Sequence, residues 1–269
     1  MNELQSKLLD ILKWFHSFCE ENGLKYYVAY GTLLGAVRHN GFIPWDDDID
    51  VHMPRNDYER FIALTFEKKK EKFLVESYRN GKKDFCYAFS KIYDTNTSLI
   101  EKKYKSIIRG VYIDVFPLDG LPADEKKSNK FLKRLCLKKN ILYTRTVALR
   151  KDRELKKNIA IILSRLIPSF ILNNQKLIRE IDNFSRSYSY EQSVYVGSLL
   201  SGEGMKERLD KSIFGNPVKY KFESLYVYGP EKSDEYLTHF YGDYMLLPPV
   251  NERKSNHRNE MIDLEKAFL

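Results

Sequence analysis

Hydrophobic residues near the start of the chain recur at steps of three and four positions. Leu4, Leu8, Ile11, Phe15 and Phe18 follow this spacing, which predicts an amphipathic helix over residues 3–21. The Asn-Gly pair at 22–23 is a typical helix end. A short strand is expected over 26–30. The Gly-Thr turn at 31–32 follows, with Thr32 placed to cap a short helix that runs through Arg38.

Acidic and apolar residues alternate from Asp48 to Met53, which predicts a strand. Asp57 is then expected to cap a helix that continues to about Lys70. Apolar runs predict three more strands, over 73–78, 87–93 and 111–116.

The second half of the chain changes character. Residues 126–188 are helical in pattern and rich in lysine and arginine, residues 194–228 are mixed, and residues 234–240 predict a short helix. The pattern therefore indicates an α/β N-terminal half and a mainly helical C-terminal half.

Composition narrows the class of protein. The chain has 269 residues, of which 43% are hydrophobic and 30% charged, as in soluble globular domains. Its three cysteines are far apart in sequence and form no CxxC pair, which argues against a zinc ribbon or a disulfide framework. The first ten residues lack the pattern of a signal peptide, and no run of about 18 apolar residues occurs. We therefore expect a cytoplasmic protein.

The positive charge is concentrated in one segment. The net charge is +8, but residues 126–157 alone hold 13 Lys/Arg against 2 Asp/Glu. Such a segment is expected to meet an anionic surface, polymer or nucleic acid, unless it is only a solvated helical face. The apolar residues at 159–163 and 166–167 suit either a membrane interface or the core of a helical subdomain.

The richest chemistry lies in Trp45-Asp46-Asp47-Asp48-Ile49-Asp50-Val51. If this segment is extended, Asp48 and Asp50 project from one face of the strand, and the intervening apolar residues from the other. Neighbouring carboxylates repel each other, and a hard cation such as Mg²⁺ relieves the repulsion while taking its remaining ligands from substrate phosphates. The alternative is an acidic turn with solvated carboxylates. Asp46 and Asp47 suit either a ligand contact or a turn.

Two further features extend this candidate site. Asp114 lies among apolar residues on a predicted strand, where it is either a third carboxylate of the site or a satisfied structural residue. Asp119 suggests a turn instead. The Gly31-Thr32-Leu33-Leu34-Gly35 run opens a helix whose free N–H groups can hold a phosphate. Arg38 can add positive charge there, or be a surface residue at the helix end.

Several of these motifs resemble those of the LicD family. The resemblance rests on residues 30–50, 54–58 and 114–119, on Lys91-Ile92-Tyr93-Asp94 followed by Thr97, and on residues 241–245 followed by Pro248-Pro249 and His257. It covers nearly the whole chain, although the basic middle matches only in general character.

The resemblance implies a nucleotidyltransferase-like fold, an α/β (α+β) mixed sheet flanked by helices. Residues 1–124 would form the catalytic core, and residues 125–269 a mainly helical basic region that completes the site and contacts acceptor or membrane. It implies Mg²⁺, or Mn²⁺ in its place, bound by Asp48, Asp50 and Asp114, which are also the expected catalytic residues. The expected substrate-binding residues are Gly31, Thr32, Arg38, Asp47, Lys91 and His257.

The implied reaction moves phosphocholine from CDP-choline to a sugar hydroxyl of a bacterial surface glycan precursor and releases CMP. Transfer of ribitol or glycerol phosphate from its CDP donor remains an alternative, as does a nucleotidyltransferase that releases pyrophosphate. A nucleic-acid-binding protein is a third class, but no recognition motif supports it and no nucleic acid partner is expected. A lipid-linked or polymeric acceptor would place the protein at the inner face of the membrane, with peripheral contact through 126–172.

Overall fold

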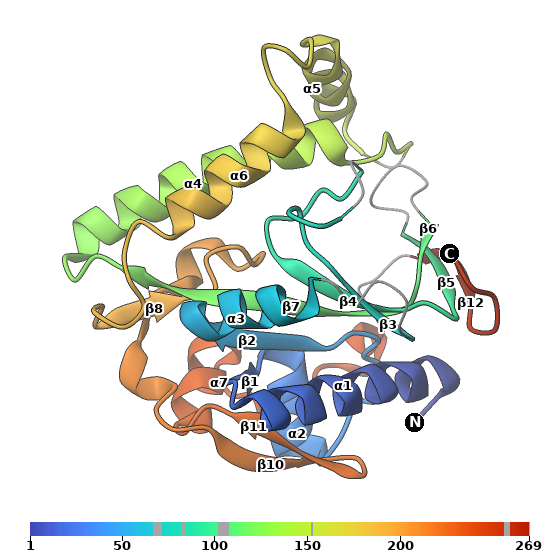
Figure 1. Ribbon diagram of the computed structural model, residues 1–269, viewed down its shortest axis with the longest axis vertical. Helices are drawn as coiled ribbons and strands as arrows, with labels where there is room; N and C mark the ends of the chain where they lie inside the picture. Colours follow the sequence, from blue (N-terminus) through green and yellow to red (C-terminus); the bar gives the residue numbers. More distant parts are fainter. Residues whose placement is uncertain (67–71, 82–83, 102–107, 152, 256–258, 269) are drawn as a thin grey trace.

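A mixed sheet forms the centre of the molecule. The computed structural model describes the chain except for residues 67–71, 82–83, 102–107, 152, 256–258 and 269. Within that part, a seven-stranded sheet has the order β1-β2-β7-β4-β3, and β8 and β9 extend it from β7 (Figure 1). The strands are β1 (Tyr27–Val28), β2 (Asp50–Pro54), β3 (Phe73–Glu76), β4 (Ser90–Asp94), β7 (Tyr112–Leu121), β8 (Tyr195–Gly197) and β9 (Leu209–Asp210).

The long strand β7 joins the two halves of the chain. Its first residues pair in parallel with β2 and antiparallel with β4. Its last residues pair with β8, where Asp119 lies opposite Gly197. Each half of the chain therefore supplies strands to the same sheet.

Three helices of the first half place their apolar residues against the sheet. They are α1 (Glu3–Asn22), α2 (Tyr30–His39) and α3 (Arg55–Thr65). Asn2 caps α1 in a reciprocal pair with Gln5, and Gly23 ends the helix with a positive φ of 58°. Phe15 of α1 packs edge-on against Phe61 of α3, with ring centroids 5.4 Å apart, so α1 and α3 are neighbours on one face of the sheet.

A helical layer follows β7, as the periodicity predicted. Helices α4 (Glu125–Thr146) and α6 (Asn174–Ser185) lie side by side and share an apolar core that includes Leu132, Leu135, Ile178 and Ile181. The shorter α5 (Leu155–Leu166) connects them and stands at one end of the molecule's long axis (Figure 1). No helix in the described ranges combines the length and apolarity that crossing a membrane requires.

The end of the chain returns to the sheet. The hairpin of β10 (Val218–Phe222) and β11 (Leu225–Gly229) packs near α2, and α7 (Ser233–Tyr241) follows it. A separate small sheet joins β12 (Asn259–Asp263), β5 (Ser98–Glu101) and β6 (Ile108–Arg109). Short 3₁₀ helices occur at Gly204–Glu207, Lys211–Ile213 and Val250–Glu252. Val196, Leu209, Phe214, Phe222 and Val227 are buried in the same core as α1. The domain boundary at 124/125 stays a prediction, and the two halves share this core.

The structure confirms the α/β class and corrects several local predictions. Helix α2 begins at Tyr30, so Thr32 lies inside its first turn and does not cap it. Helix α3 begins at Arg55 after Pro54, and Asp57 lies in its first turn; the described helix ends at Thr65, and the predicted end near Lys70 falls outside the described residues. Strand β7 continues to Leu121, so Asp119 is a buried strand residue and not a turn residue.

Candidate active site

Three ionisable side chains lie in one row across the sheet. Asp50 of β2 is in register with Asp114 of β7, which is in register with Lys91 of β4. Residues opposite each other on adjacent strands project from the same face. The Lys91 ammonium lies 2.7 Å from the Asp114 carboxylate and is 3% exposed. Its nitrogen is also 3.4 Å from the centre of the Tyr112 ring and 4.4 Å from that of Tyr87, so aromatic faces help to hold the buried charge.

Carboxylates crowd around Asp50. Burial raises the pKa of Asp50 well above its usual range, and the negative charges of Asp48, Asp114 and Asp46 raise it further, while Lys91 acts in the opposite direction. Asp48 lies before the first residue of β2, yet its charge raises the pKa of Asp50 more than that of any other neighbouring carboxylate. Ile49 is fully buried in the core, as the alternating pattern predicted. The structure therefore brings the predicted acids together.

Helix α1 fixes the loop that carries these acids. The buried Gln5 side chain donates hydrogen bonds to the backbone oxygens of Asp46, at 2.9 Å, and Ile43, at 3.5 Å. The Asp46 N–H donates to the same Ile43 oxygen. A Cβ atom on Gly31 would lie 2.8 Å from an Asp46 carboxylate oxygen. Glycine at 31 thus lets this carboxylate lie against the first turn of α2, where the helix dipole favours negative charge.

Thr32 links the same turn to the acid strand. Its buried hydroxyl oxygen accepts a hydrogen bond of 2.9 Å from the Asp50 N–H. A hydroxyl can accept and donate at once, so its proton can still be donated to a phosphate oxygen. This contact explains why Thr32 occupies the position without capping the helix.

Tyr30, the first residue of α2, was not predicted as a site residue. Its φ of 44° lies in the left-handed region, a strained conformation for a residue other than glycine. Its hydroxyl donates to the Glu207 carboxylate, and its N–H donates to the Tyr236 hydroxyl at 3.4 Å. These buried contacts hold the strained residue and so fix the turn that contains Gly31. Tyr30 is adjacent to the motif in sequence, whereas nothing local to Glu207 signals its role.

Glu207 should give the protein a measurable pH dependence. Burial raises its pKa from 4.5 to about 7, against hydrogen bonds from Tyr30, Ser201 and Ser198 and the charge of Lys139. Between these values the folded protein binds a proton that the unfolded chain has lost, so stability falls as pH rises. Relative to Glu207→Gln, which stays neutral, we expect the wild-type free energy of unfolding to fall by about 2 kcal/mol between about pH 5 and pH 7. Urea unfolding of both proteins across this range measures the difference, and a difference that does not change with pH would contradict the assignment.

Tyr241, at the end of α7, joins the site from the far end of the sequence. The residue is 43% exposed; partial burial raises its pKa, and so do the charges of Asp50, Glu203, Asp46 and Asp48. The phenol therefore lies within electrostatic range of the carboxylates. Residues 241–245 were recognised as a motif, but Tyr241 itself was not predicted as a site residue.

The remaining predicted residues have other surroundings. The Arg38 guanidinium donates to the backbone oxygens of Tyr244, at 2.6 Å, and Leu246, at 3.3 Å, and so ties the end of α2 to the loop after α7. Its predicted contact with phosphate stays a prediction. Asp47 and Asp48 border a small cavity beside α1. His257 lies outside the described residues.

The carboxylates suit a metal that takes part of its coordination from substrate. Within the described ranges, no three His, Cys, Asp or Glu side chains form a complete metal-binding group. Mg²⁺ commonly uses only one or two carboxylates and completes its shell with water and phosphate. The mutual repulsion at Asp50 is the feature that a cation would relieve. The residues present therefore fit a Mg²⁺ site in which one or two carboxylates bind the metal, and water and phosphate complete its shell.

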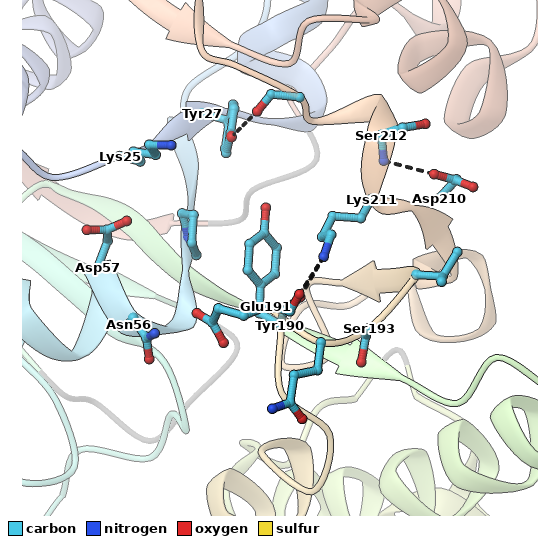
Figure 2. Close-up of a pocket in the computed structure, with 14 residues that line it drawn as sticks. Lys25, Tyr27, Asn56, Asp57, Tyr190, Glu191, Ser193, Asp210, Lys211 and Ser212 are labelled. Carbon is cyan, nitrogen blue, oxygen red and sulfur yellow. Dashed lines mark hydrogen bonds between the residues drawn. The ribbon is translucent and has the colours of Figure 1, made fainter.

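A separate cavity of about 700 Å³ lies at the other end of β2, where Pro54 borders it. Figure 2 shows Tyr27, Tyr190 and Lys211 around it, with Asp57 and Asp210 on opposite sides. The Lys211 ammonium donates to the Glu191 backbone oxygen at 2.7 Å. The length of β2 separates this cavity from Asp50.

Comparison with known proteins identifies the family of this chain. The profile of the family described as "LicD/FKTN/FKRP, nucleotidyltransferase domain" matches residues 23–144. The lipopolysaccharide cholinephosphotransferase LicD of Haemophilus influenzae is 32% identical over 265 residues, which cover 97% of each chain. The chain belongs to the LicD family.

More distant relatives match only part of the present chain. An uncharacterized protein of Rickettsia typhi is 28% identical over 152 residues, 46% of this chain and 47% of its own. Mannosyltransferase regulator 4 of Saccharomyces cerevisiae is 24% identical over 135 residues, 48% of this chain and 11% of its own. The LicD profile includes Asp48, Asp50, Lys91 and Asp114, whereas Glu207 and Tyr241 lie beyond it.

Proposed function

We propose that this protein transfers phosphocholine from CDP-choline to a hydroxyl of a bacterial cell-surface glycan precursor and releases CMP. The observation that carries the proposal is its end-to-end similarity to a lipopolysaccharide cholinephosphotransferase. The carboxylates gathered against the first turn of α2 support it, because this is an arrangement that can hold a diphosphate and a cation together. The acceptor class includes lipopolysaccharide, teichoic acid and capsule.

In the proposed reaction, the acceptor oxygen forms a bond to the phosphorus that carries choline. The bond from that phosphorus to the bridging oxygen of the diphosphate breaks, and CMP leaves with the bridging oxygen and its electron pair. The acceptor proton passes to the Asp114 carboxylate, next to the Lys91 ammonium. Most of the rate enhancement in such a transfer comes from positioning and electrostatics.

The first turn of α2 would hold the phosphates. The N–H groups of Gly31 and Thr32 lie at the positive end of the helix dipole, and the Thr32 hydroxyl adds a donor. The Asp46 carboxylate lies against this same turn and would repel a diphosphate. A cation is therefore needed for the two anions to share the site.

The proposed metal ligands are Asp48 and Asp50, and Asp114, ion-paired with Lys91, is the proposed proton acceptor beside them. Mg²⁺, or Mn²⁺, would supply the positive charge that neutralises the phosphate oxygens of donor and leaving group. Lys91 adds a positive charge that does not depend on the metal.

We expect CMP release from CDP-choline that requires Mg²⁺ and is lost in EDTA, because the diphosphate binds among carboxylates. The assay uses the purified protein with CDP-choline, CDP-ribitol or CDP-glycerol in turn and a lipid-linked glycan extract as acceptor. Asp48→Asn is the control for contaminating hydrolases.

Other outcomes separate the alternatives. CMP from CDP-ribitol or CDP-glycerol alone would keep the reaction class and replace choline by that alditol. Pyrophosphate from CTP or ATP, without CMP from any CDP donor, would replace the proposal with a nucleotidyltransferase.

A further inference from the structure

Helix α5 exposes its apolar side. Leu155 and Leu166, at its two ends, are 74% and 71% exposed. Three more large apolar side chains are also exposed, those of Ile159, Ile162 and Leu163. At 3.6 residues per turn these five positions fall within an arc of about 100°, which is a single stripe along the helix. In an ordinary surface helix such a stripe faces the core.

The opposite side of α5 fixes this orientation. Ile161 is 3% exposed, in contact with the body of the protein. The Ser164 hydroxyl donates to the Thr144 backbone oxygen at 3.2 Å, and the Arg165 guanidinium donates to the Val147 backbone oxygen at 2.5 Å. The helix is therefore held against the end of α4 by its polar side, and the apolar stripe points outward.

The exposed apolar surface continues past the helix. Phe170 is 88% exposed and Ile171 66% exposed, in the turn that leads to α6. Figure 1 shows α5 at the extremity of the molecule, clear of the sheet. We call residues 155–171 the apolar tip. A flat surface can reach this part of the protein without contacting the rest.

Positive charge borders the apolar tip. Lys151 and Lys156 are exposed beside the apolar stripe, whereas Lys157 lies on the opposite side of the helix and is paired with Glu154 at 3.0 Å. The segment 126–157, which leads into the tip, has 13 Lys/Arg against 2 Asp/Glu. An apolar stripe flanked by lysines is the chemistry of helices that lie in the interface of an anionic bilayer. A second copy of this chain would bring two such basic segments together and is disfavoured by their repulsion.

We propose that the apolar tip inserts into the interface of an anionic lipid bilayer and holds the protein there as a peripheral protein. The headgroups meet the lysines, and the apolar stripe enters the boundary of the acyl chains. This inference concerns binding and does not depend on the proposed chemistry. It would, in addition, bring the active site to the membrane where a lipid-linked acceptor is exposed.

Flotation with vesicles tests the proposal. The full chain is mixed with vesicles of phosphatidylcholine and phosphatidylglycerol in equal parts, or of phosphatidylcholine alone. We expect binding to the mixed vesicles and little to the neutral ones. Leu166→Ser with Phe170→Ser should weaken binding by about tenfold or more, because both side chains would leave the interface. Lys151→Gln with Lys156→Gln should reduce the preference for anionic lipid and its sensitivity to salt.

Tyr226→Ser is the matched control, since Tyr226 is 60% exposed on β11, away from the apolar tip. Thermal unfolding verifies that each variant is folded, and all the replaced side chains are exposed. Equal losses in the control and the tip variant would overturn the proposal, as would equal binding to both vesicle types. Absence of vesicle binding together with a dimer that Leu166→Ser and Phe170→Ser dissociate would assign the tip to a second copy instead. CMP release is measured separately, so a failure of the proposed reaction leaves this test intact.

Discussion

Replacing Asp50 by Asn should lower the rate of CMP release about a thousandfold or more, because the proposed metal ligand would contribute both position and charge to phosphoryl transfer. The substitution keeps the side chain's shape and the backbone N–H that donates to Thr32. It removes a carboxyl group whose charged form is disfavoured by burial and by the charges of Asp48, Asp114 and Asp46. The thermal unfolding temperature in EDTA should therefore stay the same or rise while activity is lost.

Asp10→Asn is the matched control, because Asp10 lies on the surface of α1 and, among the described residues, makes long contacts to Lys13, at 4.0 Å, and Lys72, at 3.8 Å. It should retain wild-type rates. If Asp50→Asn kept more than about a tenth of the activity, an effect of under 1.4 kcal/mol on the barrier, Asp50 would have no catalytic role. If its unfolding temperature fell sharply, Asp50 would be structural.

The acidic residues of this site could be predicted from the sequence because the pattern that marks them involves only neighbouring residues. Period-two alternation predicted Asp48 and Asp50 on one side and a buried Ile49 on the other. The structure confirms that Ile49 is in the core, but β2 begins at Asp50, so Asp48 precedes the strand. Asp114 could be singled out by its apolar neighbours. Its position beside Asp50 depends on the parallel register of β2 and β7, which no local pattern specifies.

Long-range partners account for what the sequence did not predict. Tyr30 and Glu207 are 177 positions apart and meet only in the folded chain, where the end of the 3₁₀ helix Gly204–Glu207 comes within hydrogen-bond distance of the Tyr30 hydroxyl. The charges of Asp50, Asp46 and Asp48 raise the pKa of Tyr241 although it is far from them in sequence, because α7 packs near α2. The helices were predicted more reliably than the strands between 195 and 229, since those strands are short and several of their residues are exposed.

The prediction that Asp119 is a turn residue was wrong, because Asp119 belongs to a buried polar cluster around Arg55. Pro-Leu-Asp-Gly is a typical turn sequence, but here it continues β7 and buries the aspartate. The Arg55 guanidinium compensates, with hydrogen bonds of 2.7 and 2.5 Å to the two oxygens of Asp119. The same guanidinium donates to Asp182 of α6 at 2.9 Å. Arg55 thereby joins α3, the sheet and the helical layer at one buried point.

Loss of Arg55 should therefore destabilise the protein strongly. Arg55→Met fills similar volume but leaves the carboxylates of Asp119 and Asp182, both 1% exposed or less, without their shared cation. Removing one partner of such a buried ion pair costs about 3–5 kcal/mol, and urea unfolding measures it. Arg79 and Tyr78 still donate to Asp182, so the larger part of the cost is expected at Asp119.

Two comparisons identify the cause of that loss. Arg60→Met, five residues along the same helix, removes an exposed guanidinium paired with Asp57 at 3.2 Å and should change stability by about 0.5 kcal/mol or less. Adding Asp119→Leu to Arg55→Met should recover part of the loss, because the buried charge disappears together with its partner. A loss under about 1 kcal/mol for Arg55→Met, or no recovery in the double variant, would mean that packing and not charge compensation dominates at this junction.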